Sequence, residues 1–573
     1  MVYAADAPPG VPLISQGQLL GATRNVVARI LFGSRRGIRT VSILRTGRLP
    51  VPVYSQTLVA ALLLLNLGCR PAASVSPPSE PVGPAWFRDV TDEVGLNFVH
   101  DPGPAGDYFF PQIQGSGAAL FDFDKDGRLD IYLLQNGGPK SRSTNRLFRQ
   151  GADGRFTDVT AGSGLDVSGY GMGVAIGDVN NDGWPDVFIT EYGRVRLFLN
   201  NRNGTFTDVT SEAGLDSPLW ATAACFFDYD RDGWLDLVVV NYVDYASARP
   251  CADSAGTRDF CGPSAFAGTV AKLYHNLGRS SGGRDRVRFE DVTLRSGLAQ
   301  HPGPGLGVVC ADFDGDGWLD IFIANDAQAN RLWINQHDGT FREEAVVRGI
   351  AYNSLGMAEA NMGIALGDIA GRGLFDVFIT HLTDETNTLW RQGPRGMFQD
   401  RTAAAGLASP RWRGTGFGAV LADFDNDGAP DLAVVNGRVK RMERVGTDPA
   451  ADTSLDPFWR PYAERNQLFA NDGQGRFRDF SSANEPFCGI ARVGRGLACG
   501  DIDGDGALDL LVTSVAGRAR LYKNTAPHRG HWLFVRAIDP ALGRDAYGAE
   551  VTVEASKRRW LGWVNPGYSY LCS

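Results

Sequence analysis

Short apolar runs alternate with polar, glycine-rich turns along most of this chain. In the stretch 118–134, the run AALF is followed by the acidic turn DFDKDGRLD and then by the run IYLL. Short apolar runs bounded by Asp and Gly are typical of β-strands, whereas helices show longer periodic segments. The 71 glycines and 30 prolines indicate frequent turns. The pattern therefore predicts an all-β protein.

Three signals repeat together, each in seven copies. Nine-residue acidic loops begin at Asp122, Asp178, Asp228, Asp312, Asp368, Asp423 and Asp501. An apolar strand follows each loop, at 146–148, 196–198, 272–274, 331–333, 388–390, 467–469 and 520–522. The sequence Phe-x-Asp-Val-Thr is intact at 87–91, 156–160, 206–210 and 289–293 and degraded at 341–345, 398–402 and 477–481. Four antiparallel strands per repeat, arranged radially, predict a seven-bladed β-propeller over 86–527.

The order of the copies predicts how the ring closes. The first Phe-x-Asp-Val-Thr, at Phe87, precedes the first acidic loop, and no copy follows the seventh apolar strand at 520–522. We therefore expect the strand near Phe87 to complete the seventh blade.

The acidic loops have the residue pattern of a calcium site. In the first loop, Asp122, Asp124, Asp126 and Asp130 occupy positions 1, 3, 5 and 9, and Gly127 at position 6 permits a sharp turn. Oxygen ligands in a flexible loop suit Ca²⁺. An EF-hand is excluded because it needs Glu at position 12, which is apolar in all seven loops.

Six loops keep this ligand set, so we expect about six calcium ions. The predicted ligands in the other five complete loops are Asp178, Asn180, Asp182 and Asp186; Asp228, Asp230, Asp232 and Asp236; Asp312, Asp314, Asp316 and Asp320; Asp423, Asp425, Asp427 and Asp431; and Asp501, Asp503, Asp505 and Asp509. The fifth loop loses two ligands and carries Arg372 at position 5. We expect this loop to be empty and neutralised by its own arginine.

The N-terminal segment, 1–68, predicts export. Its longest apolar run, 58–65, is too short to span a bilayer, and it lies between Arg45 and Arg48 on one side and Gly68 on the other. The Gly68–Cys69 junction resembles a bacterial lipoprotein cleavage box, which would place a lipid on Cys69. Because the run lies far from residue 1, we expect translation to start near 41–53. The proline-rich linker 69–85 then separates the membrane from the propeller.

Charge excludes one class of partner. The chain has a net charge of −9, and the first 68 residues contain seven arginines but a single acid, so the remainder is more acidic still. Nucleic-acid binding requires clustered Lys and Arg. We expect no nucleic acid partner, and membrane contact through a lipid anchor alone.

The quoted repeats resemble the FG-GAP/VCBS repeats of integrin-type propellers across 87–526. The segments 531–535, 543–553 and 567–571 in the C-terminal part, 528–573, look like the start of an ASPIC/UnbV domain. This pairing resembles the cartilage-acidic-protein family and its bacterial relatives. In that family the tail domain continues further, so the resemblance implies a truncated small β domain after the propeller.

Enzyme chemistry finds little support in the sequence. The seven histidines form no zinc-binding spacing, and no Cys-x-x-Cys occurs. We therefore expect a non-catalytic binding or scaffold module of the cell envelope, secreted or anchored by lipid. The alternative is a calcium-dependent propeller enzyme, a lyase or hydrolase acting on polysaccharide. Its candidate basic residues are Arg438, Lys440 and Arg441.

Two long inserts suggest a binding surface. They lie at about 245–271 and 437–466, between the second and third strands of the third and sixth repeats. We expect a Cys251–Cys261 disulfide in the first insert. The pattern predicts that both inserts rim one mouth of the central channel, opposite the acidic loops, and bind a protein or glycan at the cell surface. The predicted exposed anchors are Phe260, Phe266, Phe458, Trp459 and Tyr462.

Insertions without function remain the alternative interpretation of these two segments. The partners of the other cysteines also stay open at this point. Cys488 can pair with Cys499, and Cys225 and Cys310 are equally compatible with free thiols.

Overall fold

The computed structural model describes most of the chain from residue 83 onward. The described residues are 27–34, 37–42, 83–245, 250–253, 255–279, 287–441, 447–527, 529–555, 558–565 and 570–573. Cys69 and nearly all of the proline-rich linker lie outside them, so lipidation stays a prediction.

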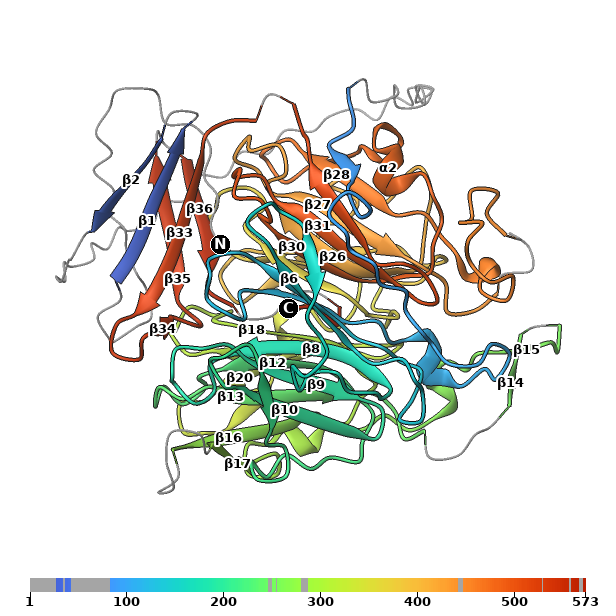
Figure 1. Ribbon diagram of the computed structural model, residues 1–573, viewed down its shortest axis with the longest axis horizontal. Coiled ribbons are helices and arrows are strands. Elements are labelled where there is room, and N and C mark those ends of the chain that lie inside the picture. The colour runs from blue at the N-terminus through green and yellow to red at the C-terminus, as the bar shows by residue number, and fades with distance from the viewer. Residues whose placement is uncertain are drawn as a thin grey trace, which may run out of the picture.

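Seven four-stranded antiparallel sheets form a propeller, which confirms the predicted fold class (Figure 1). Each blade runs outward from the channel, and its acidic loop joins its first two strands. Blade 1 is β4 (Ala118–Phe121), β5 (Asp130–Leu133), β6 (Arg146–Gln150) and β7 (Phe156–Asp158). Blade 2 is β8 (Gly171–Gly177), β9 (Asp186–Glu191), β10 (Arg194–Asn200) and β11 (Phe206–Asp208). Blade 3 is β12 (Ala221–Phe227), β13 (Asp236–Asn241), β16 (Lys272–Arg279) and β17 (Val287–Asp291).

The next three blades repeat this order. Blade 4 is β18 (Gly305–Ala311), β19 (Asp320–Asn325), β20 (Arg331–Asn335) and β21 (Phe341–Glu343). Blade 5 is β22 (Ile364–Gly367), β23 (Asp376–Ile379), β24 (Thr388–Gln392) and β25 (Phe398–Asp400). Blade 6 is β26 (Gly416–Ala422), β27 (Asp431–Asn436), β28 (Gln467–Asn471) and β29 (Phe477–Asp479).

The seventh blade closes the ring in the predicted way. Its strands are β30 (Gly494–Gly500), β31 (Asp509–Ser514), β32 (Arg520–Asn524) and, from the other end of the propeller, β3 (Phe87–Asp89). β3 pairs antiparallel with β32, and Phe87 lies opposite Asn524. The two ends of the propeller are thus joined by main-chain hydrogen bonds between β3 and β32.

The inner strands are apolar on both sides because each blade packs between two others. On β12, Phe226 packs toward blade 2, whereas Phe227 packs toward blade 4. Both rings are buried, at 1 % exposure each. Burying a side chain of this size contributes about 1.5–3 kcal/mol. Continuous apolar runs, rather than alternating ones, are therefore expected in these strands.

Helices contribute little to the fold. In the described part of the chain the two α-helices are single turns, α1 (Ala345–Arg348) and α2 (Glu485–Cys488). The 3₁₀ turns are η1 (Phe110–Ile113), η2 (Pro263–Ala265), η3 (Leu298–Gln300), η4 (Arg460–Tyr462) and η5 (Ser481–Ala483). Among the described residues, no helix is long and apolar enough to cross a membrane.

The C-terminal segment forms a small β unit beside the acidic loops. It contains β33 (Trp532–Asp539), β34 (Arg544–Asp545), β35 (Glu550–Ala555) and β36 (Arg558–Trp563). Two N-terminal strands, β1 (Val27–Ser34) and β2 (Gly37–Ser42), extend the sheet of β33 (Figure 1). They belong to the segment expected to be removed on export, and that removal stays a prediction.

The two inserts lie on the face opposite the tail, where the hairpin of β14 (Cys251–Ala252) and β15 (Arg258–Asp259) projects (Figure 1). The two inserts, which belong to blades 3 and 6, contact each other. The ring of Phe260 stacks on Trp459, with centroids 5.8 Å apart, and the Tyr462 hydroxyl donates a 2.6 Å hydrogen bond to Asp259 Oδ1. Cys251 and Cys261 form a disulfide in the first insert.

The prediction that the insert aromatics are exposed is wrong. Phe260, Trp459 and Tyr462 are no more than 2 % exposed, and Phe266 and Phe458 are only partly exposed. The physical reason is that both inserts fold inward over the channel mouth. Their rings remove apolar surface from water by packing on each other, which leaves few of them available to a ligand.

Candidate metal centres

Each acidic loop is shaped by hydrogen bonds that its own carboxylates accept. In the first loop, the Gly127 N–H donates to Asp122 Oδ2 at 2.9 Å, and the Asp126 N–H donates to Asp122 Oδ1 at 3.0 Å. Gly127 has φ +88°, a conformation that glycine adopts without strain. The position-1 aspartate therefore organises the loop through these two main-chain hydrogen bonds.

The position-9 aspartates anchor the loops to the blades. Asp130 Oδ2 accepts the Phe123 N–H, and its Oδ1 accepts the Gln150 N–H from the third strand. The same third-strand bond recurs at Asp186, Asp236, Asp320, Asp376, Asp431 and Asp509. All seven side chains are buried. This second role of position 9 is not visible in the sequence pattern.

Position 4 connects neighbouring loops. Lys125 Nζ donates to the Gly183 carbonyl of the second loop at 2.7 Å, and Asn181 Nδ2 donates to the Gly233 carbonyl of the third at 2.9 Å. Asn426 makes the corresponding bond to Gly506. Sequence reasoning missed these contacts because position 4 varies from copy to copy.

Within the described residues, at least four loops gather carboxylate oxygens within 4.8 Å of one another. The groups are Asp122, Asp124 and Asp130; Asp228, Asp230 and Asp232; Asp312, Asp314 and Asp316; and Asp423, Asp425 and Asp431. The oxygens Asp124 Oδ1, Asp228 Oδ1 and Asp314 Oδ1 are buried without a hydrogen-bond donor. Such donor sets fit a hard divalent cation, which would supply the missing partner.

In the second and seventh loops, the position-1 aspartate accepts main-chain hydrogen bonds as it does in the first loop. Asp178 accepts the Asp182 and Gly183 N–H groups, and Asn180 Oδ1 also accepts the Asp182 N–H, at 3.1 Å. In the seventh loop, Asp501 accepts the Asp505 N–H at 3.1 Å.

Burial makes ionisation of these acids costly without a counter-charge. It raises the pKa of Asp130 to about 7 and that of Asp423 to about 8, and nearby carboxylates add to both shifts. Asp228 and Asp509 are also raised to about 7, mainly by burial. A bound cation would offset this cost by stabilising the ionised form.

The metal-free protein should therefore be more stable at pH 5.5 than at pH 8. Carboxyls whose pKa is higher folded than unfolded bind extra protons in the native state, so they lower the free energy of unfolding as pH rises from about 4 to about 8. We expect a drop of several degrees in the melting temperature of metal-stripped protein between these two pH values. Asp423→Asn should reduce the drop, and an unchanged pH dependence in this variant would contradict the assignment.

Basic side chains occupy some loops. In the fifth loop, Arg372 Nη2 lies 2.6 Å from Asp376 Oδ1, which confirms the predicted self-neutralisation. Arg149 Nε lies 2.5 Å from Asp124 Oδ2 in the first loop, and Lys523 ion-pairs with Asp503 in the seventh. The last two contacts come from third strands and were not predicted.

The tail unit packs against the acidic loops. Arg544, which is 6 % exposed, donates to Asn181 Oδ1 at 2.7 Å and to the Gly233 carbonyl at 3.1 Å. Trp560 Nε1 donates to the Gly428 carbonyl at 3.0 Å on the sixth loop. The tail unit therefore packs on the same loops that can hold metal.

The opposite face offers little catalytic machinery among the described residues. Arg438, a candidate for a lyase site, is buried in a 2.9 Å ion pair with Glu464, and the main chain of Arg441 donates to Asp259.

Cys225, Cys310, Cys488 and Cys499 are free thiols.

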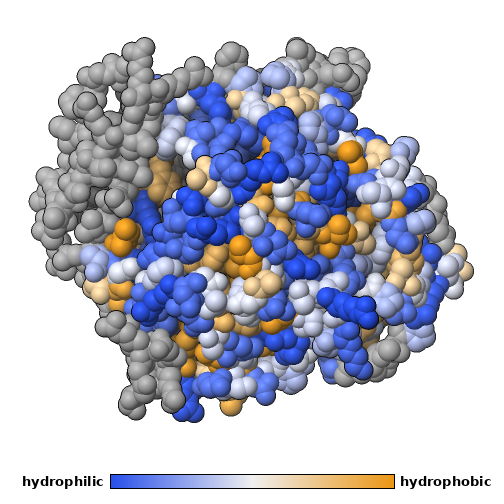
Figure 2. All heavy atoms as spheres, in the orientation of Figure 1, coloured by the Kyte–Doolittle hydropathy of each residue, from blue (hydrophilic) through white to orange (hydrophobic). Residues whose placement is uncertain are grey.

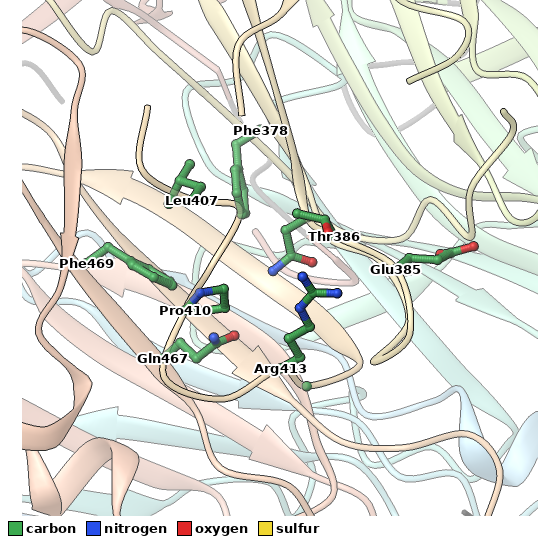
Figure 3. A pocket seen from close by; sticks show the side chains of 10 residues that line it. Phe378, Glu385, Thr386, Leu407, Pro410, Arg413, Gln467 and Phe469 are labelled. Atoms are coloured by element: carbon green, nitrogen blue, oxygen red, sulfur yellow. The ribbon is translucent and has the colours of Figure 1, made fainter. Parts of the chain in front are cut away.

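A small cavity lies between blades 5 and 6. In Figure 3, Phe378, Leu407 and Phe469 lie to one side of it, with Gln467 and Arg413 nearby. Its volume of about 20 Å³ admits little more than a water molecule. The face drawn in Figure 2 mixes hydrophilic and hydrophobic residues and shows no broad apolar area.

The fold and the loops define the chain as a seven-bladed propeller with a ring of acidic, metal-competent loops. The profile of the FG-GAP-like repeat matches residues 122–189, 178–239, 312–379, 368–434 and 451–512, together more than half of the chain. The first four matches each begin at an acidic loop. The chain therefore belongs to the FG-GAP-like repeat family.

Curated relatives share this repeat region. Cartilage acidic protein 1 of Xenopus tropicalis is 27% identical over 358 residues, 54% of this chain and 54% of that protein. The Homo sapiens protein is 29% identical over 331 residues, 50% of this chain and 49% of its own length. The chain thus spans about half the length of the curated relatives it matches.

A solved structure of an Agrocybe aegerita lectin, which recognises non-reducing terminal N-acetylglucosamine, is a more distant match. It has a TM-score of 0.34 and 14% identity, and the match covers 65% of this chain and 84% of the lectin. Similarity at this level carries no argument about function.

Proposed function

We propose that this protein is a non-catalytic binding or scaffold module that works outside the cytoplasm and is stabilised by about six calcium ions. The observation that carries the proposal is the division of the propeller into two faces. Acidic loops with unpartnered carboxylate oxygens lie on one face, beneath the tail unit. The two long inserts form the other face, away from the tail.

The calcium ions would occupy loops one to four, six and seven. Carboxylates at positions 1, 3, 5 and 9 would supply the oxygens, with Asn180 in place of an aspartate in the second loop. The fifth loop would stay empty because it lacks carboxylates at positions 3 and 5 and because Arg372 already ion-pairs with its position-9 aspartate. Calcium would be structural here, because it would neutralise carboxylates that burial otherwise forces to bind protons.

Location follows from the N-terminal sequence. A basic stretch, a short apolar run and the Gly68–Cys69 junction support export and lipid attachment at Cys69. The proline-rich linker would hold the propeller away from the membrane, and the tail, which resembles an ASPIC/UnbV domain, would brace the acidic loops. The ligand would be a protein or a glycan at the cell surface, met by the insert face.

A combined screen separates this proposal from the polysaccharide lyase or hydrolase alternative. Mature protein in 5 mM CaCl₂ is applied to an array of envelope glycans, and the same glycans are then assayed for new reducing ends or unsaturated products. We expect retention of intact glycan, or no glycan signal if the ligand is a protein. Depolymerisation by the wild type that persists after removal of contaminating activities would overturn the non-catalytic assignment.

A further inference from the structure

The third acidic loop differs from the others in the side chain that faces it from the third strand. This side chain comes just before the residue whose N–H binds the position-9 aspartate. In blade order it is Arg149, Leu199, His275, Ile334, Arg391, Ala470 and Lys523. Three blades therefore present a cation to the loop and three an aliphatic group. Blade 3 presents an imidazole.

The imidazole nitrogen Nδ1 lies close to two carboxylates of the loop. His275 Nδ1 is 3.1 Å from Asp236 Oδ1 and 3.4 Å from Asp230 Oδ2. These three side chains form one of the groups whose ligand atoms all lie within 4.8 Å. Two donors bound to a tetrahedral zinc ion at about 2.0–2.1 Å would be about 3.3 Å apart. The spacing found here therefore suits one ion among the three groups.

A second observation also indicates a missing cation. Asp228 Oδ1, at position 1 of the same loop, is buried and has no hydrogen-bond donor. In the first, second, sixth and seventh loops the equivalent oxygen accepts the position-5 N–H. Asp228, Asp230 and Asp232 form another set of side chains whose ligand oxygens all lie within 4.8 Å of one another.

We propose that the third loop binds a divalent transition-metal ion of the Zn²⁺ class through Asp230, Asp236 and His275. Imidazole nitrogen is a preferred ligand of zinc, whereas calcium takes oxygen ligands. Asp236 is already oriented by the main-chain N–H groups of Tyr229 and Asn276, so one ligand is fixed before the ion arrives. The inference reassigns one loop of the proposed function and leaves the other five to calcium.

The competing explanation is that His275 acts as a counter-charge. A protonated imidazole would then ion-pair with the loop carboxylates, as Arg149 does with Asp124 and Lys523 with Asp503. In that case the third loop would bind no transition metal.

The test is a metal titration of the full mature chain. Protein stripped of metal is saturated with 5 mM Ca²⁺ and titrated with Zn²⁺ by calorimetry and with Co²⁺ by visible absorption. We expect one transition-metal ion per chain, bound at least 100-fold more tightly than calcium. His275→Leu, which copies blade 2, should weaken Zn²⁺ binding at least 100-fold and remove the Co²⁺ band.

Two further variants keep the result interpretable. Asp230→Ala removes a partly exposed ligand and should also lose the ion, even if His275→Leu folds poorly. His337→Leu is the matched control, because His337 contacts Asp316 of the fourth loop from an exposed position. It should bind Zn²⁺ like the wild type.

Absence of Zn²⁺ binding in the wild type, or equal binding by wild type and His275→Leu, would overturn the zinc assignment. The calcium content of the other loops is measured in the same samples by elemental analysis. Failure of the calcium proposal would therefore appear separately, as a chain without calcium, whatever happens at the third loop.

Discussion

Removal of calcium is expected to lower the melting temperature of this protein by on the order of 10 °C or more. Extracellular calcium modules have Kd values of roughly 10⁻⁴–10⁻³ M, so 10 mM calcium adds about 1.4–2.7 kcal/mol of stability per site. Several such sites act together on one ring. Thermal unfolding followed by circular dichroism in calcium and in excess chelator measures the shift.

Two single substitutions test where the effect originates. Asp312→Ala removes a position-1 ligand of the fourth loop and should reduce the calcium-dependent shift by about one site's share. Asp368→Ala is the matched control, because it removes position 1 of the loop that Arg372 already neutralises. It can lower stability through lost backbone hydrogen bonds, but the shift on adding calcium should remain unchanged. Identical melting of the wild type in calcium and in chelator would contradict the calcium proposal.

Arg495→Met is expected to destabilise the protein by about 3–5 kcal/mol at saturating calcium. Arg495 lies on the innermost strand of blade 7 and is completely buried. Its guanidinium donates to the carbonyls of Ile113, Gly437, Gly494 and Arg438, at 2.6–3.1 Å. It also lies 3.9 Å from the centroid of the Phe417 ring.

The physical reason for the large effect is that methionine fills similar space but donates no hydrogen bond. Four buried carbonyls from three segments of the chain would then lose this donor, and water has little access to replace it. Burial lowers the pKa of Arg495 to about 9, so the side chain is charged at neutral pH and its hydrogen bonds are charge-assisted.

Urea unfolding at 5 mM calcium provides the measurement. Arg413→Met serves as the control, because Arg413 is exposed and should change the free energy of unfolding by less than about 0.5 kcal/mol. A loss of under about 1 kcal/mol in Arg495→Met would show that the carbonyls find other donors.

The sequence by itself determined the repeated parts of this protein. The strand pattern, the acidic loops and the ring closure through Phe87 were all readable, and so was the neutralised fifth loop. The reason is that each depends on contacts within one blade or on a count of copies. The Arg372–Asp376 pair joins residues four apart on one loop, so its geometry follows from the loop pattern alone.

Only the tertiary structure decided what lies beside those parts. Arg149, His275 and Lys523 face their loops because the third strand pairs with the second in a fixed register. In the sequence alone, nothing distinguishes these three residues from other polar residues in a strand. The insert aromatics looked exposed because long loops usually are. They are buried because two segments about 200 residues apart meet over the channel, where Tyr462 binds Asp259. Such contacts depend on closure of the ring, which brings distant segments together in a way that no local pattern records.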